Sequence, residues 1–214
     1  MIKRPILPIL MIISGIIAGI LIAGALYALT GFSVFGGAQS KTVSVEDAEN
    51  VEMTTLAYRI LEYIRDDDYA ALSNVVHPEF GVVFSPYATV TISAVQRFSA
   101  KDVANFSTDS HVYVWGVYNG SGQPIEHTPV EYITNFVPAA DFFGETIIGI
   151  NRIVRRGNAL ENITEVFPNV KFIDFHLPGQ ETGEELDWRS LRLGFEEYNG
   201  YFRLVVIIYS TWTA

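Results

Sequence analysis

The sequence predicts an α+β domain of about 170 residues that follows an apolar N-terminal segment long enough to cross a membrane. Three observations indicate this fold class. Residues 5–29 are almost wholly apolar, and the region after Ser44 has apolar residues at helical spacing. The remainder alternates as strands and ends in two apolar runs joined by Asn199-Gly200. With 49% hydrophobic residues, the composition excludes a disordered protein.

Residues 5–29 are expected to form a single transmembrane helix. As a helix this segment extends ~37 Å, which exceeds the hydrocarbon core of about 30 Å. Lys3 and Arg4 precede the segment, and the next basic residue is Lys41. The positive-inside tendency therefore places the N-terminus in the cytoplasm and the C-terminal domain outside the cell membrane.

This interpretation divides the chain into three parts. Residues 1–30 are a cytoplasmic tip and transmembrane anchor, 31–43 are a Gly-rich linker, and 44–214 are an extracytoplasmic domain. The alternative is a secreted protein, released by cleavage of a signal peptide at one of two small-x-small sites, residues 23–25 or 36–38. The chain has no cysteine, so it contains neither a disulfide nor a lipid-bearing cysteine. Its net charge of −10 argues against nucleic acid as a partner.

Two helices are predicted at the start of the domain. Ser44, with Asp47 three residues later, resembles a capping box and predicts that a helix follows. The charged run 65–68 interrupts the helical pattern, and Asp67 or Asp68 then caps a second helix. The first helix has one apolar stripe: Leu56, Ile60, Leu61 and Ile64.

The sequence His77-Pro78-Glu79 has two interpretations. In the first, His77 lies in the last turn of the second helix, Pro78 ends that helix, and Gly81 turns the chain into a strand. In the second, His77 and Glu79 are a functional pair. The first interpretation accounts for each of these residues, and we favour it.

Strands predominate beyond this point, with short helices between them. Ser99 caps one of these helices, and Thr128 caps another that has Pro129 in its first position. The predicted strands are 82–90, 111–118, 145–154 and 169–177, and the predicted helices are 99–106 and 128–136.

The strongest local signal is a C-terminal β-hairpin whose two-residue turn is Asn199-Gly200. An unbroken register from this turn gives one apolar face, which helices must cover. That face pairs Leu191 with Ile208, Leu193 with Val206, and Phe195 with Leu204. The outer face then carries Arg192, Val205, Ile207 and Tyr209.

The strand 169–177 places a polar cluster on the same outer face. Asp174 and His176 share one side of that strand, where they can meet Arg192. An Asp/His/Arg group is a candidate site. Because the outer face is expected to be open to solvent, a solvated charge network is the alternative that we favour.

The order of elements resembles the cone-shaped NTF2-like (SnoaL-like) superfamily, over roughly residues 44–214. Several segments also resemble a family of uncharacterised bacterial extracytoplasmic proteins, often lipoproteins. In that family a His-Asp pair tends to precede the C-terminal Gln-Trp-Thr, whereas this chain has Tyr209 and Ser210 there. The segments are "HPEFGVVFSPYATV", "FSAKDV", "YVWGVYNGSGQPI", "EYITNFV" and "DWRSLRLGFEEYNGYFRLVVIIYSTWT".

The resemblance implies a pocket between the sheet and the helices, which suits a small apolar ligand. The function expected is therefore a membrane-anchored binding or assembly module without catalysis. Two alternatives stay open: an enzyme with an acid or base residue in the cone, and an accessory subunit of a membrane complex. The candidate ligand-binding residues are Ser85, Tyr87, Tyr113, Trp115 and His77.

A homodimer is a further expectation. Gly15, Gly19 and Ala23 form a small-residue stripe on the membrane helix, and such stripes allow helices to approach closely. The outer sheet face with Val205, Ile207 and Tyr209 offers a second contact surface. The four histidines have no metal-binding spacing, so we expect no metal and no cofactor.

Overall fold

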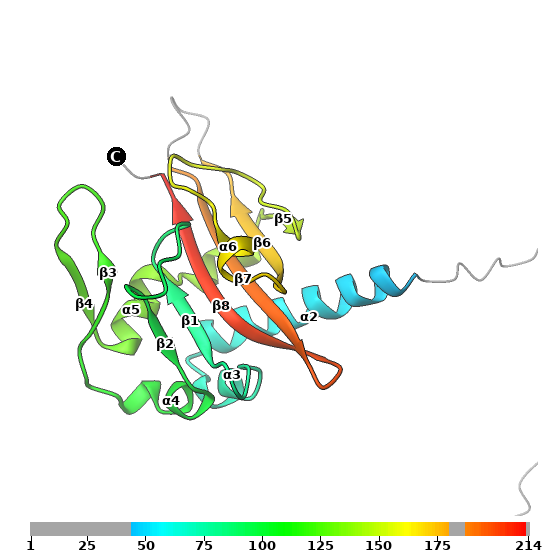
Figure 1. The fold of residues 1–214 in the computed structure, drawn as a ribbon, viewed down its shortest axis with the longest axis horizontal. Helices are drawn as coiled ribbons and strands as arrows, with labels where there is room; N and C mark the ends of the chain where they lie inside the picture. The colour runs from blue at the N-terminus through cyan, green and yellow to red at the C-terminus, as the bar shows by residue number, and fades with distance from the viewer. Residues whose placement is uncertain (1–43, 180–186, 213–214) are drawn as a thin grey trace, which may run out of the picture. The chain divides into compact units, whose positions relative to one another are not determined.

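The computed structural model of the chain describes residues 44–179 and 187–212 (Figure 1). Among these residues, no helix is both long enough and apolar enough to cross a bilayer. The segment 5–29, with Gly15, Gly19 and Ala23, lies outside the described residues. Ser44–Ala214 forms one compact unit by its internal contacts.

The first two helices begin at the expected caps. Helix α2, Val45–Arg65, starts where the Ser44 hydroxyl accepts a hydrogen bond from the Asp47 N–H, at 3.0 Å. Helix α3, Tyr69–Ser73, starts where the Asp68 carboxylate accepts from the Ala71 N–H, at 2.9 Å. The side of α2 that packs into the core carries Met53, Ala57, Ile60, Leu61 and Ile64, so the predicted stripe is confirmed except that Leu56 is only partly buried.

Six strands form a mainly antiparallel sheet in the order β2-β1-β8-β7-β6-β5, and only β1 and β8 run parallel. The α+β class predicted from the sequence is confirmed. The strands are β1 Val82–Ser85, β2 Gln96–Phe98, β5 Ile147–Ile150, β6 Lys171–Leu177, β7 Arg189–Tyr198 and β8 Tyr201–Thr211.

A two-stranded sheet and several short helices complete the described fold. Helices α4 and α5 begin at Ser99 and Thr128, as the sequence predicted, and the structure adds that each start is a capping box. The small sheet pairs β3 Tyr113–Val117 with β4 Pro124–His127. The helices are α4 Ala100–Ala104, η1 Phe106–Thr108, α5 Pro129–Phe136, η2 Ala139–Phe143 and α6 Ile163–Val166.

The main sheet is covered on both faces. Helix α2 lies on one side of it and α6 on the other (Figure 1). The larger core lies on the α2 side and includes Leu191, Leu193 and Phe195 of β7. A smaller core lies on the α6 side: Val83, Val90, Ile163, Phe167, Phe172, Val205, Val206 and Ile208.

The predicted register of the C-terminal hairpin is correct near the turn and wrong beyond it. Tyr198 pairs with Tyr201 and Phe195 with Leu204, as expected. A β-bulge at Val205 then shifts β8 by one residue, so that Leu193 faces Ile207 instead of Val206. Because side chains alternate along a strand, the shift places each residue of β8 beyond the bulge on the face opposite to the one expected.

The bulge also corrects the proposed dimer surface. Ile207 packs in the core on the α2 side, and Tyr209 pairs with Leu191 of that same face. Val205 is fully buried in the core on the α6 side. The expectation that Val205, Ile207 and Tyr209 form an open outer face is therefore wrong.

His77 does not lie in a helix, because α3 ends at Ser73. The backbone around His77 pairs with β8 instead: the His77 N–H donates to the Leu204 carbonyl at 3.0 Å, and the Leu204 N–H donates to Val75 at 2.8 Å. The His77 Nδ1 accepts from the Phe80 N–H at 2.9 Å. His77 therefore stabilises the turn that leads into β1.

The strand predicted over 82–90 ends early, at Ser85. Pro86 has no N–H to donate to a neighbouring strand, and this ends the pairing. Residues 86–95 then form the loop between β1 and β2. This loop forms part of the two hollows described below.

We predict that Gly194→Ala destabilises the domain by about 1–3 kcal/mol. A Cβ at Gly194 would lie 2.5 Å from Val206 Cγ1 and 2.8 Å from Val170 Cγ2, so the sheet or its cover must move. Gly144→Ala is the matched control, because nothing lies within 4 Å of its added Cβ. Urea denaturation of both variants measures the difference. Equal stabilities would contradict the tight packing at Gly194.

Candidate functional site

A cleft of about 480 Å³ opens between the β1–β2 loop and the β3–β4 hairpin. Two of the residues predicted to contact a ligand, Ser85 and Tyr87, line this cleft. The lining consists of hydroxyl-bearing, amide, small and aliphatic residues: Ser85, Pro86, Tyr87, Thr89, Thr91, Ala94, Val95, Gly116, Val117, Asn119, Gly120 and Ala159.

Hydrogen bonds across the sequence hold the loop wall of the cleft in place. The Thr89 hydroxyl donates to the Leu160 carbonyl at 2.7 Å. Asn162 accepts from the Val90 N–H at 2.8 Å and donates to the Val90 carbonyl at 2.9 Å. The β1–β2 loop is therefore fixed to the segment that covers the outer face of the sheet.

Ser85 and Tyr87 organise the base of the same loop. Ser85 is buried, and its hydroxyl donates to the Tyr87 carbonyl at 2.8 Å. The Tyr87 hydroxyl accepts from the Asn119 N–H at 3.3 Å, which connects the loop to the β3–β4 hairpin. This hydrogen bond joins the two walls of the cleft.

A glycine allows the hairpin to approach the loop. Gly116 has a φ of +143°, in the region that other residues rarely adopt, and a Cβ there would lie 3.3 Å from Pro86 Cγ. The ladder between β3 and β4 is irregular at this position, between Val114 and Val117. The width of the cleft therefore depends on Gly116.

The lining of the cleft favours an uncharged ligand. Tyr87 is its ionisable side chain, and the other lining groups are neutral hydroxyls, an amide and aliphatic carbons. A charged ligand group buried here would lose its hydration without gaining a partner of opposite charge, which is costly. The volume lies within the range of about 300–1,000 Å³ that is usual for small-molecule sites.

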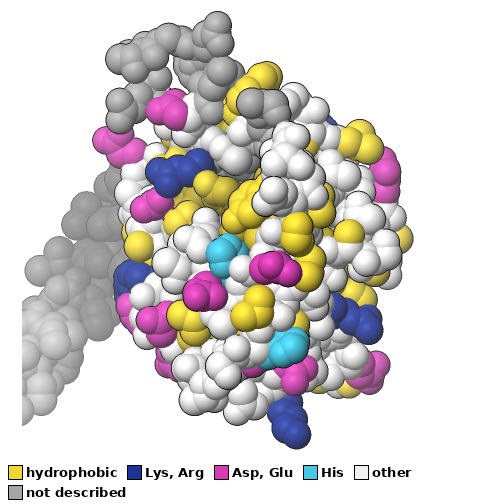
Figure 2. All heavy atoms as spheres, turned by 90° about the vertical axis from the view of Figure 1, so that its left-hand side faces the viewer, with side chains coloured by type: hydrophobic (Ala, Val, Ile, Leu, Met, Phe, Trp, Pro, Cys, Tyr) yellow, Lys and Arg dark blue, Asp and Glu magenta, His cyan; other side chains and the backbone are white. Residues whose placement is uncertain are grey.

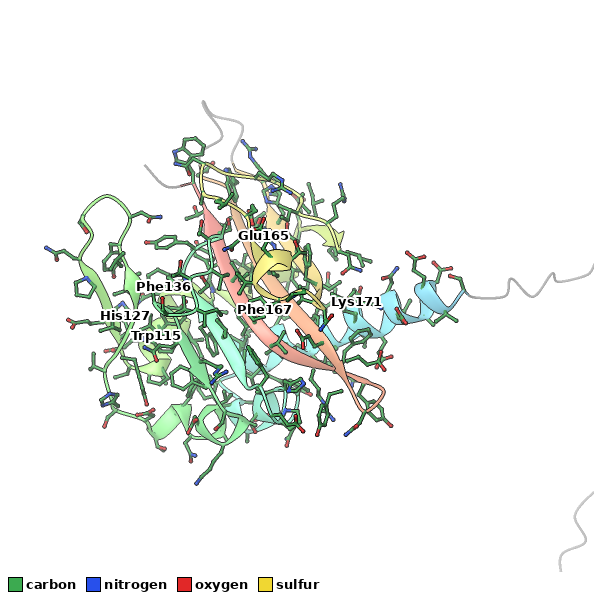
Figure 3. All side chains as sticks on the ribbon, viewed as in Figure 1. Trp115, His127, Phe136, Glu165, Phe167 and Lys171 are labelled. Atoms are coloured by element: carbon green, nitrogen blue, oxygen red, sulfur yellow. The ribbon has the colours of Figure 1, made fainter. Side chains whose placement is uncertain are left out.

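The other three predicted ligand contacts lie outside the lining. Trp115 is buried beneath the hairpin, where its ring stacks on Tyr132 at 3.8 Å and its Nε1 donates to the His127 carbonyl at 2.9 Å. Tyr113 packs on Phe98, and His77 belongs to the turn before β1. Trp115 and His127 lie together with Phe136 at this end of the molecule (Figure 3).

The outer side of the β3–β4 hairpin is partly apolar. Figure 2 shows hydrophobic side chains gathered on this side of the molecule, with carboxylates and histidines among them. Val112, Val114, Val117 and Tyr118 are exposed here. Alternation along β3 explains this, since Tyr113 and Trp115 point inward.

Sequence analysis did not identify Tyr132, which lies in the interior close to the cleft. Its side chain is fully buried, and its hydroxyl has no hydrogen-bond partner among the described residues. Burial raises the pKa of Tyr132 well above its usual value, and nearby Tyr87 adds to this effect. A phenol without a partner costs free energy, so a water molecule or a ligand group reaching this hydroxyl would be favoured. Only the helical position of Tyr132, four residues after the Thr128 cap, could have indicated its burial.

The cluster of Asp174, His176 and Arg192 is buried, which corrects the expectation that it is exposed to solvent. The segment between β5 and β6 covers it. The Arg192 guanidinium donates to the Glu161 carboxylate at 2.6 Å, and its Nε lies 3.3 Å from Asp174 Oδ1. The other Asp174 oxygen accepts from the Val154 N–H at 2.7 Å. Burial raises the pKa of Asp174, and the charge of Arg192 opposes that shift.

His176 belongs to a neighbouring row of the same face. It pairs across the strands with Ser190, which in turn pairs with Ser210. The His176 Nδ1 lies 2.9 Å from the Ser190 hydroxyl, which is the spacing of a nucleophile and its base. Both side chains are buried, beside Trp188, so a substrate has no access to this pair. The part of the cluster that fastens the covering segment to the sheet is Arg192 with Asp174.

Comparisons with known proteins give little further information. No protein-family model matches the sequence, and no curated protein matches it. Among solved structures, a designed protein named for NTF2 is similar over 78% of this chain and 99% of its own length, with 9% identity and a TM-score of 0.33. A TM-score this low carries no argument about the fold, so the fold is described from the strand order of this chain alone.

We predict that Arg192→Met destabilises the domain by about 3–5 kcal/mol, because it removes the cation that pairs with the buried Glu161 and Asp174 carboxylates. Arg189→Met on the same strand is the control. Its ion pair with Asp141 is about 40% exposed, and we expect a change of at most ~1 kcal/mol. Urea denaturation at neutral pH measures both. A small effect for Arg192→Met would show that the buried pair does not hold the cover.

We also predict that acid destabilises the domain through His176. Burial lowers the pKa of His176, and the positive charge of Arg155 lowers it further. Below the pKa of about 6.5 that histidine has in the unfolded chain, the unfolded state binds a proton more readily than the folded state does. The free energy of unfolding therefore decreases as the pH falls. His176→Gln removes this component. The stability advantage of the wild type over His176→Gln should shrink between about pH 7.5 and pH 5; a constant difference would contradict the prediction.

Proposed function

We propose that residues 44–214 form an NTF2-like domain that acts as a non-catalytic binding module. In this proposal the cleft beside Ser85 and Tyr87 holds a small uncharged molecule. Residues 5–29 anchor the module to the cell membrane, with the domain outside.

The topology supports the NTF2-like part of the proposal. Two helices come first, the β1–β2 hairpin follows, and the chain ends with the antiparallel run from β5 to β8. The last strand, β8, returns to pair in parallel with β1. The resulting sheet curls around a core filled by α2, α3, α4 and α5, which is the arrangement of a cone.

The cleft is the observation that carries the binding function. Its walls come from two separate loops that hydrogen bonds fix in place, so the site exists before a ligand arrives. A site that is already formed loses less entropy on binding than one that must be ordered. The apolar body of a ligand would contact Pro86, Val95 and Val117, while its polar groups would meet Thr91 and Asn119.

The interior of the cone favours binding over acid–base catalysis. Among the described residues, the ionisable side chains fully enclosed in the larger core are tyrosines, Tyr69 and Tyr132. Burial raises the pKa of both, Tyr69 to a value above the usual range, so each stays protonated at neutral pH. Carboxylates and imidazoles are the usual general bases, and among the described residues the larger core contains neither group.

The membrane anchor is supported by the sequence. Residues 5–29 contain no charged side chain, and Lys3 and Arg4 precede them. An anchor of this kind would keep a binding domain at the outer surface of the membrane.

Native mass spectrometry of the full-length chain, purified gently from its own cells, tests the binding function. We expect an extra mass of a few hundred daltons that denaturation releases. Ala94→Trp places a large side chain at the exposed edge of the cleft and should abolish the extra mass. Ala140→Trp, at an exposed alanine away from the cleft, is the matched control and should retain it.

Three results would count against this function. If both tryptophan variants keep the extra mass, the ligand lies outside the cleft. If the purified chain carries no small molecule and instead co-isolates with a defined membrane protein, the accessory-subunit alternative is favoured. A dimer without ligand would support an assembly role.

A further inference from the structure

A second hollow, of about 300 Å³, lies on the outer face of the sheet, next to the cleft. It shares only Val95 with the lining of the cleft. Figure 3 shows Phe167 over this face of the sheet. The hollow is lined by Phe80, Val83, Ile92, Val95, Arg97, Val166 and Phe167.

The floor and walls of this hollow, which we call the outer groove, are apolar and well supported. Val83 and Phe167 are buried members of the smaller core and form its floor. Phe80, Val95 and Val166 pack against that core and are partly buried, while Ile92 stands exposed at the edge. Phe80 and Phe167 meet edge to face, with ring centroids 6.0 Å apart. The groove therefore has fixed aromatic walls.

Arg97 is the one charged residue of the lining. It pairs with Val83 across β1 and β2, so its side chain stands on the same face as the groove floor. Its guanidinium lies 5.3 Å from the centre of the Phe80 ring, which holds it at the groove. The ion pairs formed within residues 44–179 and 187–212 do not include Arg97.

We propose that the outer groove binds a single-chain amphiphile with a carboxylate headgroup, such as a medium-chain fatty acid. The acyl chain lies along Phe80, Val83 and Phe167, and the carboxylate accepts hydrogen bonds from the Arg97 guanidinium. Arginine presents several donors in a plane, which matches the two oxygens of a carboxylate.

The charges around the groove support an occupant that brings its own anion. Glu79, next to Phe80, accepts a hydrogen bond from the Tyr198 hydroxyl at 3.0 Å and is engaged there. Glu165 precedes Val166 but is exposed and forms no ion pair with Arg97. The chain as a whole is strongly acidic, yet Arg97 lies at the apolar outer groove without a carboxylate partner among the described residues. This combination favours a ligand that has both an apolar chain and an anionic group.

The size of the groove favours one acyl chain. A volume of about 300 Å³ is at the lower end for small-molecule sites and suits a single chain better than a two-chain lipid. The proposed occupant is therefore a free fatty acid in its carboxylate form and not a two-chain lipid of the bilayer.

Photo-crosslinking on the full-length chain in phosphatidylcholine nanodiscs tests the proposal. The probe is dodecanoic acid with a diazirine at mid-chain, and its methyl ester is the uncharged match. Peptide mapping should locate the acid at Phe80–Val83 and Val166–Phe167, with competition by unlabelled dodecanoate. Labelling of these peptides relative to the rest of the chain should be about fivefold lower with the ester.

Variants separate charge recognition from apolar partitioning. Arg97→Gln should lower the relative labelling by the acid about fivefold and leave labelling by the ester unchanged, whereas Arg97→Lys should restore part of it. Arg59→Gln on α2, an exposed arginine elsewhere, is the matched control for the loss of charge. Circular dichroism of each variant checks that the fold is retained.

Three outcomes would overturn the proposal. One is equal labelling by the acid and the ester, and another is labelling without enrichment in the groove peptides. The third is labelling that phosphatidylglycerol in the nanodisc suppresses but that unlabelled dodecanoate in phosphatidylcholine nanodiscs does not, which would assign the groove to a bilayer lipid. Because this test reads residues outside the cleft, its failure is distinguishable from failure of the proposed function.

Discussion

The pairing of β7 with β8 is the constraint on which the rest of the structure depends. These are the two longest strands, and both of their faces are buried. An antiparallel sheet often exposes one polar face, but here Val205, Val206 and Ile208 make the second face apolar. Burying only one face would leave a large apolar surface in water. The chain must therefore supply two separate covers for one sheet.

The second cover produces the two hollows. The segment between β5 and β6, with α6, lies over the outer face and is tied to the sheet through Glu161 and Arg192. The β1–β2 loop is tied to the same segment through Asn162. The cover and the loop meet the sheet and the β3–β4 hairpin without filling all the space between them. One gap is the cleft beside Tyr87, whose lining is uncharged and mixes hydroxyl, amide and aliphatic groups, and the other is the apolar groove beside Phe167.

Local chemistry in the sequence predicted much of the fold. The helix caps at Ser44, Ser99 and Thr128 and the hairpin turn at Asn199-Gly200 depend only on neighbouring residues, so they can be recognised without the tertiary structure. The bulge at Val205 could not be recognised in this way. It arises where Gly194 allows the outer cover to approach β8, which is a contact between distant parts of the chain. An error of one residue there was enough to reverse the faces of β8.

The candidate site shows the same limit. Ser85 and Tyr87 were chosen as polar and aromatic side chains near the mouth of the expected cone, and both line the cleft. The loop that places them there was not predicted, because the strand was expected to continue through Pro86 to Val90. The burial of Asp174, His176 and Arg192 was missed. Their alternation along the strands was read correctly, but the sequence does not show that the segment between β5 and β6 folds over them. Tyr132 was missed because its unsatisfied hydroxyl is a property of the packed interior.

Two arginines on the outer face show how burial separates structure from function. Arg192 has no exposed surface and lies beside the carboxylates of Glu161 and Asp174, so its charge is balanced within the fold. Arg97, in contrast, lies beside the ring of Phe80. It remains exposed and forms no ion pair within the described residues. A charge that is balanced internally stabilises the fold and has little left to offer a ligand. A charge that stays accessible next to apolar surface contributes little to folding, and that accessibility leaves Arg97 available to recognise an anion.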